Sequence, residues 1–494
     1  MMKILFIYPK YPDTFWSFKH ALDFISKKAS FPPLGLLTVA AMLPKEWEKK
    51  LVDMNVSALK DKDIQWADCV FISAMITQKE SAREIVARCN KYGIKVVAGG
   101  PLFTTGYEEF EEVDHFVLGE AETTLPQLLE DLQKGYAKRI YTSDERPDIT
   151  RTPIPQWDLI NVKDYVAMPV QFSRGCPFDC EFCDIVIMNG RVPRTKTANQ
   201  LLREFDAVYK TGFRGTVFIV DDNFIGNKAK VKKMLPEIIQ WQKERGYPFW
   251  LLTEASLNLA DDENLMQMMV KAGFSKVFIG LETPVEESLA ECNKVQNRNR
   301  DMVAAVKKIQ NHGMQVLGGY IVGFDNDPPD IANKQIEFVQ KGGIPIAMVG
   351  ILSVLPGTPL YKRLKEKGRL LEESAGNNTD GSINFVPKID PKTLKADYLK
   401  IIQTIYSPKK YFERIITFFE EYKPARKRMR ITASEIGGFA KSIWRIGVKG
   451  GWYERWFYWR LLAVSAIKYR SLFSEAVVLQ IYGLHFRKIV DELK

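Results

Sequence analysis

Histidine and cysteine are both scarce in this chain of 494 residues, which holds four His and six Cys. Six Cys in a chain this long are too few for a disulfide scaffold, and so few His give little support to a zinc site. No apolar run approaches the roughly 18 residues that a membrane-spanning helix needs, and residues 461–467 form one of the longer runs. We therefore expect a protein of a reducing compartment, the cytoplasm by default, that does not span a membrane.

The length and composition are those of a globular protein with several domains. A chain of 494 residues exceeds what one hydrophobic core organises, and 46% hydrophobic with 26% charged residues lies near the globular average. Residues 423–494 hold 15 Lys or Arg against five Asp or Glu, which accounts for the whole net charge of +10. The same segment carries four of the ten Trp, so we expect it to be a separate unit.

Residues 1–135 alternate short apolar runs with amphipathic stretches, which predicts a doubly wound, Rossmann-like parallel sheet. Strands are expected at residues 4–8, 50–53, 69–73, 95–98 and 115–118. Such sheets bind ligands at the carboxyl ends of their strands. Small or turn residues gather at those ends or close to them: Tyr8, Asp53, Ser73, Met75, Gly99, Gly100, Pro101, Gly119 and Glu120. Tight turns use many of the same residues, so the recurrence of the pattern matters more than any one strand end.

Three further segments follow in the rest of the chain. Residues 136–168 are rich in Pro and charge without periodicity, which predicts a linker. Residues 169–365 alternate strands and helices again, with strands expected at residues 170–173, 216–220, 250–254, 276–281, 316–322 and 348–354. Six such units predict a partial (β/α)6 barrel. Residues 366–494 are expected to be a helical C-terminal region with a basic, aromatic tail.

The sharpest motif is Ser173-Arg174-Gly175-Cys176-Pro177-Phe178-Asp179-Cys180-Glu181-Phe182-Cys183, at the end of the first barrel strand. Its three thiols are separated by three and then two residues, and no second Cys or His pair lies nearby. Three thiolates on one loop suit a [4Fe–4S] cluster that is bound at three irons and leaves the fourth open. The remaining residues Cys69, Cys89 and Cys292 lie in apolar patterns and are predicted to be core residues.

The cysteine loop resembles that of the radical S-adenosylmethionine (SAM) superfamily, with Phe182 at the usual aromatic position. The resemblance implies that Cys176, Cys180 and Cys183 hold the cluster and that SAM chelates the open iron. Reduction, by a donor such as flavodoxin or ferredoxin, then cleaves SAM to a 5′-deoxyadenosyl radical. The same resemblance implies SAM contacts at later strand ends: Asp221, Asp222, Asn223, Glu254, Ser256, Glu282 and Gly323. Asx turns or helix caps are the alternative for the first three, and close barrel packing for the glycines.

Taken together, the first two domains resemble the cobalamin (B12)-dependent radical SAM enzymes, in the branch that contains the hopanoid C-2 methylase. The resemblance rests on Phe31-Pro32-Pro33-Leu34-Gly35-Leu36, Gly99-Gly100-Pro101 and Gly119-Glu120-Ala121-Glu122, and it adds Pro33 and Gly35 to the strand-end residues as cobalamin contacts. Asp53-Met54-Asn55-Val56-Ser57-Ala58 stands where other cobalamin domains carry DxHxxG, so no imidazole is available there to ligate cobalt. A nucleotide-binding domain is the alternative, although no GxGxxG follows the first strand.

The resemblance implies a C-methyltransferase in which the adenosyl radical removes hydrogen from an unactivated carbon and methylcobalamin donates the methyl group. One alternative keeps both cofactors for cyclisation, ring contraction or carbon–carbon coupling without methyl transfer. A more remote alternative is a non-catalytic, cluster-bearing protein that binds phosphates through Lys423-Pro424-Ala425-Arg426-Lys427-Arg428-Met429-Arg430. No nucleic-acid-binding motif accompanies that basic run, so no nucleic-acid partner is expected.

The aromatic tail has a helical pattern of its own. Trp452, Trp456 and Trp459 fall on one face of a helix, with Arg455 and Arg460 beside that face. An aromatic stripe inside an enzyme more often packs, so we expect this face to cover the barrel as a lid over the substrate. Trp beside Arg is also typical of a helix at an anionic membrane surface, and peripheral membrane contact is the alternative. A lid that also touched a bilayer would admit a hydrophobic, lipid-like small-molecule acceptor.

Overall fold

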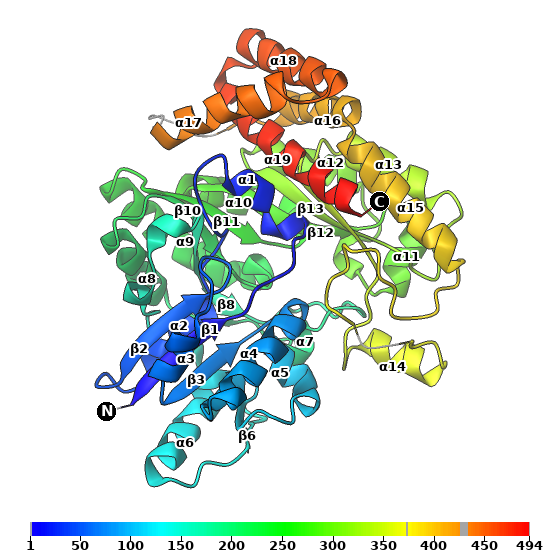
Figure 1. Ribbon diagram of the computed structural model, residues 1–494. Coiled ribbons are helices and arrows are strands. Elements are labelled where there is room, and N and C mark those ends of the chain that lie inside the picture. Colours follow the sequence, from blue (N-terminus) through cyan, green and yellow to red (C-terminus); the bar gives the residue numbers. More distant parts are fainter. Residues whose placement is uncertain (1, 372–373, 425–432, 494) are drawn as a thin grey trace.

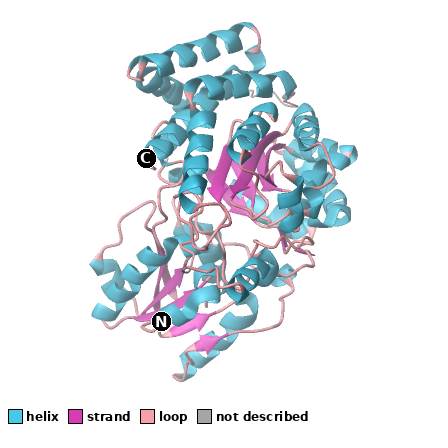
Figure 2. Cartoon of the chain, turned by 90° about the vertical axis from the view of Figure 1, so that its right-hand side faces the viewer, coloured by secondary structure: helices cyan, strands magenta, loops and turns pink. Residues whose placement is uncertain are grey.

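The structure is a computed structural model that describes residues 2–371, 374–424 and 433–493 (Figure 1). Two regions are parallel sheets covered by helices, and a third region consists of helices that continue to the C-terminal end (Figure 2). The predicted α/β class with a helical C-terminal region is confirmed.

The first sheet has six parallel strands in the order β2-β1-β3-β4-β5-β6. They are β1 (Lys3–Tyr8), β2 (Glu48–Asp53), β3 (Cys69–Ser73), β4 (Lys95–Gly99), β5 (His115–Val117) and β6 (Ile140–Tyr141). One face is covered by α2 (Leu34–Met42) and α6 (Ala121–Lys134), and the other by α3 (Asp61–Trp66), α4 (Lys79–Lys91) and α5 (Pro101–Gly106). Two separate buried clusters result, as a doubly wound sheet requires.

The segment expected to be a linker, residues 136–168, is folded against this sheet. It contributes β6, whose two residues pair in parallel with β5. Tyr165 lies buried and donates a hydrogen bond to Asp53 (3.0 Å). A strand of two residues is too short to leave a periodic signal in the sequence, which explains why it was not expected.

The second sheet has six parallel strands in the order β14-β13-β12-β11-β10-β7, and its two edge strands do not pair with each other. The strands are β7 (Ala167–Val170), β10 (Gly215–Ile219), β11 (Phe249–Glu254), β12 (Phe274–Glu282), β13 (Gln315–Val322) and β14 (Ala347–Ile351). Their helices are α8 (Ala198–Lys210), α9 (Lys228–Glu244), α10 (Glu263–Ala272), α12 (Met302–Asn311) and α13 (Ile331–Lys341). This open arrangement is the predicted partial barrel.

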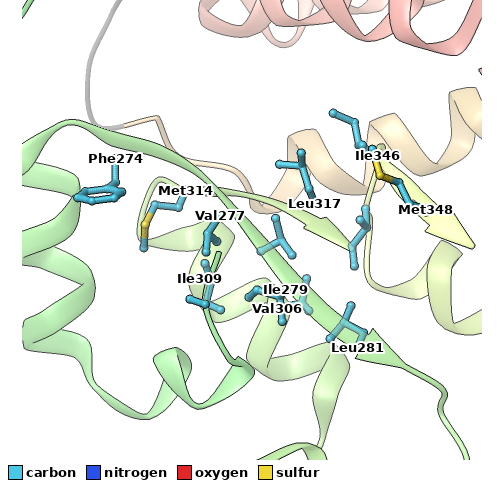
Figure 3. Close-up of a cluster of buried hydrophobic side chains, with 14 of the residues drawn as sticks. Phe274, Val277, Ile279, Leu281, Val306, Ile309, Met314, Leu317, Ile346 and Met348 are labelled. Atoms are coloured by element: carbon cyan, nitrogen blue, oxygen red, sulfur yellow. The ribbon is translucent and has the colours of Figure 1, made fainter. Parts of the chain in front are cut away.

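Alternation along the strands separates an outer face from an inner face. Val277 and Ile279 of β12 lie with Val306 and Ile309 of α12 in the buried cluster between sheet and helices (Figure 3). Because successive strand residues point to opposite faces, Phe278 between them faces the inside of the barrel.

The first barrel strand lies earlier in the chain than the expected residues 170–173. β7 ends at Val170, and β8 (Ser173–Arg174) pairs instead with β9 (Arg194–Thr195) in an antiparallel ribbon. The carboxylate of Asp221 accepts the backbone N–H of Phe172 (2.8 Å), a group that would otherwise continue the sheet. The cysteine loop therefore begins from the ribbon and not from the barrel sheet.

The C-terminal helices pack on the outside of the barrel. They are α14 (Pro359–Glu366), α15 (Pro391–Tyr406), α16 (Pro408–Glu421), α17 (Ala433–Ser442), the π-helical segment η10 (Ile443–Val448), α18 (Trp452–Ile467) and α19 (Phe473–Glu492). Ile405, Phe418 and Phe486 join the barrel core. The basic run at residues 425–430 lies outside the described residues. None of the helices in the described ranges is long and apolar enough to cross a membrane.

The expectation that the Trp face of the tail covers the barrel is wrong. Trp452, Trp456 and Trp459 of α18 are 74%, 60% and 46% exposed, whereas Phe457 and Leu461 on the opposite side are buried. The helix therefore packs through its Phe and Leu side chains, and its Trp stripe faces outward.

A long segment after β1 connects all three regions. Residues 9–33 leave the first sheet and run beside α19, as the dark blue trace in Figure 1 shows. Phe15 contacts Phe486, with 5.7 Å between ring centroids, and α1 (Lys19–Leu22) packs on α19. The first domain thereby supplies side chains to the surroundings of the barrel.

Candidate active site

The cysteine loop is held in a tight turn. Gly175 has a φ of +100°, and a Cβ there would lie 2.8 Å from the carbonyl oxygen of Gly190. Cys176 N–H donates to that same carbonyl (3.2 Å), and Cys183 N–H donates to Cys180 (3.0 Å). Only glycine fits at position 175, and this turn sets the direction of the chain that carries the three thiols.

Protein donors reach the sulfur atoms. Asn223 Nδ2 lies 3.8 Å from Cys176 Sγ, and Gln296 Nε2 lies 3.6 Å from Cys180 Sγ. Burial raises the pKa of the Cys183 thiol to about 12, so a free thiolate is disfavoured there without a positive partner. Sulfur atoms that lie near amide donors fit a bound iron–sulfur cluster, which supplies that charge.

A single metal ion fits this loop less well. In the described parts of the chain, no three Cys, His, Asp or Glu side chains form a group that could hold one metal ion. The oxygens Gln296 Oε1 and Asn297 Oδ1 are buried without a hydrogen-bond partner among the described residues. Unsatisfied buried acceptors fit a site that a bound group completes.

Asp221 and Asp222 both brace the loop. Asp221 accepts hydrogen bonds from Phe172 N–H and from Ser173 Oγ (2.6 Å), and burial raises its pKa to about 7. Asp222 accepts from Gly175 N–H (2.8 Å) and from Asn189 Nδ2 (3.0 Å). These carboxylates already have protein partners, whereas the side chain of Asn223 reaches a thiol sulfur.

Glu254 ends β11 and differs from the two Asp residues. Its carboxyl group makes no hydrogen bond or ion pair within the part of the chain that the structure describes. Burial, and then the nearby charges of Asp222 and Asp221, raise its pKa to about 8. Ser256, two residues on, contacts both Asn223 (3.2 Å) and Asn258 (2.7 Å). A carboxyl without a protein partner at a strand end is suited to accept from a ligand hydroxyl.

Glu282 forms an ion pair that sequence reasoning missed. Its carboxylate lies 2.6 Å from Lys294 Nζ, and its backbone φ is +61°. Burial works against the charge of Lys294, but Glu282 and the Cys180 sulfur hold the pKa of this ammonium above its ordinary range. Lys294 also lies 5.8 Å from the ring centroid of Phe182. A cation is therefore fixed beside the thiols.

Gly323 follows β13 with a φ of +105°. Its N–H donates to the carboxylate of Asp327 (2.8 Å), and the neighbouring Phe324 ring lies 6.3 Å from the Phe182 ring. The turn at Gly323 thus reaches the aromatic side chain of the cysteine loop.

The strand ends of the first sheet meet at one edge. The register pairs Tyr8 with Asp53, Ser73 with Gly99, and Gly99 with Val117. Asp53 is buried, and it accepts from Asn55 Nδ2 (2.8 Å) and Tyr165. Burial raises the pKa of Tyr8 above its ordinary value, so its hydroxyl stays protonated.

Asn55 occupies the place of the missing histidine. Its Nδ2 donates to Asp53 and to the Pro9 carbonyl (3.1 Å), and its Oδ1 accepts from Tyr11 N–H (3.0 Å). Every polar atom of this amide is therefore engaged by the protein, and none is free to approach a metal.

Glycines leave room along the same edge. A Cβ on Gly35 or Gly119 would meet no atom within 4 Å. Met75, which follows the end of β3, is 45% exposed. Gly100, which precedes Pro101, is instead packed closely, since a Cβ would lie 2.5 Å from Ser73 Oγ. Pro33 is buried as the N-cap of α2. Open space beside small residues fits a large flat group such as a corrin ring.

An ion-pair network joins this edge to the cysteine loop. Arg174, next to Gly175, contacts Glu120 (2.7 Å) and Glu122 (2.8 Å) at the start of α6. Arg194 binds Glu120 as well (2.7 Å). Burial opposes the charge of Glu122, but the hydrogen bonds from Arg174 outweigh it and hold the pKa at about 2. Glu120, expected as a cobalamin contact, therefore has three arginine partners, because Arg146 also lies 3.7 Å from its carboxylate.

Aromatic side chains line the inner face of the barrel. Phe278 of β12 packs against Trp16, and Phe218 of β10 packs against Phe31, with 5.0 and 5.3 Å between ring centroids. Phe218 and Phe278 are half-buried, and Trp16 is 46% exposed. Both outer partners belong to the segment after β1, so two domains form this lining.

Several residues of the site were not expected from the sequence. Lys294, Gln296 and Asn297 come from a turn more than a hundred residues after the cysteine loop. Arg174 stands inside the cysteine motif without a role assigned to it. The polar cluster Asn293-Lys294-Val295-Gln296-Asn297 after a short helix was the one signal available. The other Cys residues, Cys69, Cys89 and Cys292, are buried as expected.

Comparison with protein families divides the chain in the same way. Residues 24–129 match the B12 binding domain and residues 170–339 match the radical SAM superfamily. Residues 358–494 match a domain of unknown function, DUF4070.

Relatives match most of the chain. An uncharacterized methyltransferase of Synechocystis sp. is 41% identical over 99% of this chain and 93% of its own length. The hopanoid C-2 methylase of Rhodopseudomonas palustris is 32% identical over 91% of this chain and 86% of its own length.

Solved structures share the fold. The cobalamin-dependent SAM radical enzyme OxsB, with aqua-cobalamin and SAM bound, gives a TM-score of 0.64 at 15% identity and covers 100% of this chain and 80% of its own. The radical SAM methyltransferase TsrM from Kitasatospora setae gives 0.60 at 14% identity and covers 94% and 99%. The chain therefore belongs to the cobalamin-dependent radical SAM methyltransferases, whose cofactors are a [4Fe–4S] cluster, SAM and cobalamin.

Proposed function

We propose that this enzyme methylates an unactivated carbon of a hydrophobic, lipid-like small molecule. The observation that carries the proposal is the inner face of the barrel, where Phe218 and Phe278 meet Phe31 and Trp16 of the first domain. Aromatic side chains from both cofactor domains are suited to hold an apolar acceptor between the two cofactors. The similarity to the hopanoid C-2 methylase supports the same class of acceptor.

We assign the cofactor contacts to the cysteine loop, the barrel strand ends and the edge of the first sheet. Cys176, Cys180 and Cys183 hold the cluster, while Phe182, Asn223, Ser256, Glu254, Glu282 and Gly323 bind SAM, with Asp221 and Asp222 bracing the loop. Tyr8, Pro33, Gly35, Asp53, Ser73, Met75, Gly99, Gly100, Pro101, Gly119 and Glu120 form the cobalamin edge. When bound, SAM at the reduced cluster supplies a 5′-deoxyadenosyl radical that removes hydrogen, and cobalamin supplies the methyl group.

The chain's own residues position these groups and exclude water. Lys294 keeps a positive charge beside Cys180, where it can attract a carboxylate of the bound ligand. Glu254 is free to accept from a sugar hydroxyl, and Trp16 shields the aromatic lining. An electron donor such as flavodoxin or ferredoxin completes the reaction, and we place the enzyme in the cytoplasm with peripheral contact to the membrane.

Isotope labelling tests the reaction. Anaerobic protein with both metal cofactors is incubated with a reductant, SAM bearing a deuterated methyl group, and an apolar lipid extract. We expect 5′-deoxyadenosine together with a product that gains one labelled methyl group. Formation of 5′-deoxyadenosine with a rearranged, unlabelled product would instead favour cyclisation or coupling, and no 5′-deoxyadenosine would favour a non-catalytic protein.

A matched pair of variants tests the acceptor site. Trp16→Ala removes part of the proposed lining, whereas Tyr136→Ala removes an aromatic side chain that is 57% exposed in the first domain. We expect the first variant to raise KM for an apolar acceptor about tenfold, at unchanged cofactor content, and the second to leave it unchanged. Equal KM values for both variants would refute the assignment of the lining.

A further inference from the structure

The outward side of α18 carries an apolar stripe along the whole helix. Trp452, Trp456, Trp459 and Ile467 follow one another at helical spacing, and Ile467 is 77% exposed. In η10, which packs on α18, Trp444 is 55% exposed. We call these five residues the tryptophan face.

The opposite side of α18 is apolar as well. Phe457, Tyr458, Leu461 and Leu462 are buried against the neighbouring helices. A helix that is apolar on two sides normally buries both, and scattered exposed side chains do not form such a line. The tryptophan face therefore has the composition of a surface that a partner covers. Figure 1 shows α17 and α18 at the end of the molecule far from the first sheet, where a large partner has access.

Positive charge surrounds the tryptophan face. Arg455 and Arg460 are exposed on α18, and Lys449 lies 5.2 Å from the ring centroid of Trp444. Glu454 is the single acid of α18, and it is paired with Arg487 (2.6 Å). The surface thus combines large aromatic rings with cations and offers no unpaired acid on this helix.

We propose that the tryptophan face docks on the surface of a membrane that contains anionic phospholipid. Indole rings prefer the headgroup level, and neighbouring cations bind lipid phosphates. A second copy of the chain would fit poorly, because pairing this face with itself would bring Arg455, Arg460 and Lys449 against the same cations. The contact is peripheral, since no helix of the described residues is suited to span the bilayer.

The docking surface is connected to the proposed acceptor site. Lys441 Nζ donates to the Asp23 carbonyl (2.9 Å), and Arg445 lies 3.4 Å from the Asp23 carboxylate. Asp23 belongs to the segment whose Trp16 covers Phe278 in the barrel. The inference rests on the proposed function only in this respect: a lipid-like acceptor gives the enzyme a reason to bind a bilayer.

Vesicle sedimentation tests the docking directly. The full-length protein with its cofactors is mixed with vesicles of phosphatidylcholine alone or of equal parts phosphatidylcholine and phosphatidylglycerol. We expect binding to the anionic vesicles that weakens as salt rises, and much weaker binding to the neutral ones. No binding to anionic vesicles at low salt overturns the proposal.

Two variants and two controls assign the binding to the face. Trp452→Ala with Trp456→Ala should lower binding at least about tenfold, and Lys449→Gln with Arg455→Gln should weaken its salt dependence. Tyr136→Ala and Lys62→Gln change exposed residues of the first domain and should bind as the unaltered protein does. All of these side chains are exposed, so folding is expected to survive. Unchanged vesicle binding by the Trp variant overturns the proposal. The proposal is also overturned if the unaltered protein does not bind vesicles but forms a dimer in sedimentation velocity, and the Trp variant abolishes that dimer.

The vesicle assay needs no turnover, so its failure is distinguishable from failure of the proposed function. If the protein binds vesicles through the tryptophan face but methylates only polar acceptors, the docking surface is supported and the lipid-like acceptor is contradicted. If the protein methylates a lipid in detergent but does not bind vesicles, only the docking surface is contradicted.

Discussion

Around the cysteine loop, polar side chains make specific contacts. Asn223 and Gln296 reach sulfur atoms, and Asp222 accepts a hydrogen bond from the Gly175 backbone. Along the strand ends of the first sheet, by contrast, Gly35 and Gly119 face open space. One region works through chemically specific groups that are already in place, and the other through the absence of side chains. Removing atoms should therefore damage the first region, whereas adding atoms should damage the second.

The largest effect is expected at the thiols. Cys176→Ala, Cys180→Ala or Cys183→Ala removes one proposed cluster ligand, so each should abolish the visible iron–sulfur absorbance and all formation of 5′-deoxyadenosine. Cys89→Ala, which removes a buried thiol of helix α4 in the first domain, is the matched control and should retain the cluster. A single loop variant with full cluster content and activity would contradict the ligand assignment.

Adding a side chain tests the opposite region. Gly35→Leu places atoms in open space at the start of α2 and should weaken cobalamin binding at least about tenfold, while the cluster content stays normal. Gly437→Leu in α17 also meets no atom within 4 Å at its Cβ and serves as the control. Cobalamin absorbance after gel filtration measures both variants. Equal cobalamin retention by the two proteins would place the corrin elsewhere.

The half-buried residue Glu254 gives a smaller effect with a defined pH dependence. Its pKa is about 8 in the folded state and 4.5 ordinarily, so the unfolded chain loses this proton first as pH rises. Stability of the cofactor-free protein should therefore fall between about pH 4.5 and 8 and level off above. Glu254→Gln should remove this slope and gain about 1 to 3 kcal/mol at pH 8, while weakening SAM binding.

Urea unfolding of the cofactor-free protein at pH 5 and pH 8 measures this difference. The change in unfolding free energy between the two pH values should be larger for the unaltered protein than for Glu254→Gln. If both proteins show the same change, Glu254 does not hold its proton in the fold.

The smallest effect is expected at Asn55. Because its amide is engaged by Asp53, Pro9 and Tyr11, the protein offers no nitrogen ligand to cobalt at this place. The electron paramagnetic resonance spectrum of bound cob(II)alamin should lack nitrogen superhyperfine splitting, and Asn55→Ala should leave it the same. Splitting that disappears in the variant would show that Asn55 ligates cobalt.

Sequence reasoning succeeded where the signal is local. The Cys spacing and the alternation of strands and helices are written within a few residues, and both the family and the two sheets followed from them. It missed Lys294 and Gln296, because their position beside Cys180 depends on how a distant turn folds over the loop. It also expected the wrong side of α18 to be buried, since both sides are apolar and only packing distinguishes them.

Arg174 links the cysteine loop directly to the first domain. It precedes the cysteine loop directly, yet its guanidinium is anchored in the first domain by Glu120 and Glu122. Whatever fixes the loop thereby also fixes the proposed cobalamin edge, and thermodynamic linkage makes this coupling reciprocal. We therefore predict that assembly of the iron–sulfur cluster changes the affinity for cobalamin, and that cobalamin changes the stability of the cluster by the same factor. During maturation the two metal cofactors would then be acquired cooperatively, and the domains would not behave as interchangeable modules.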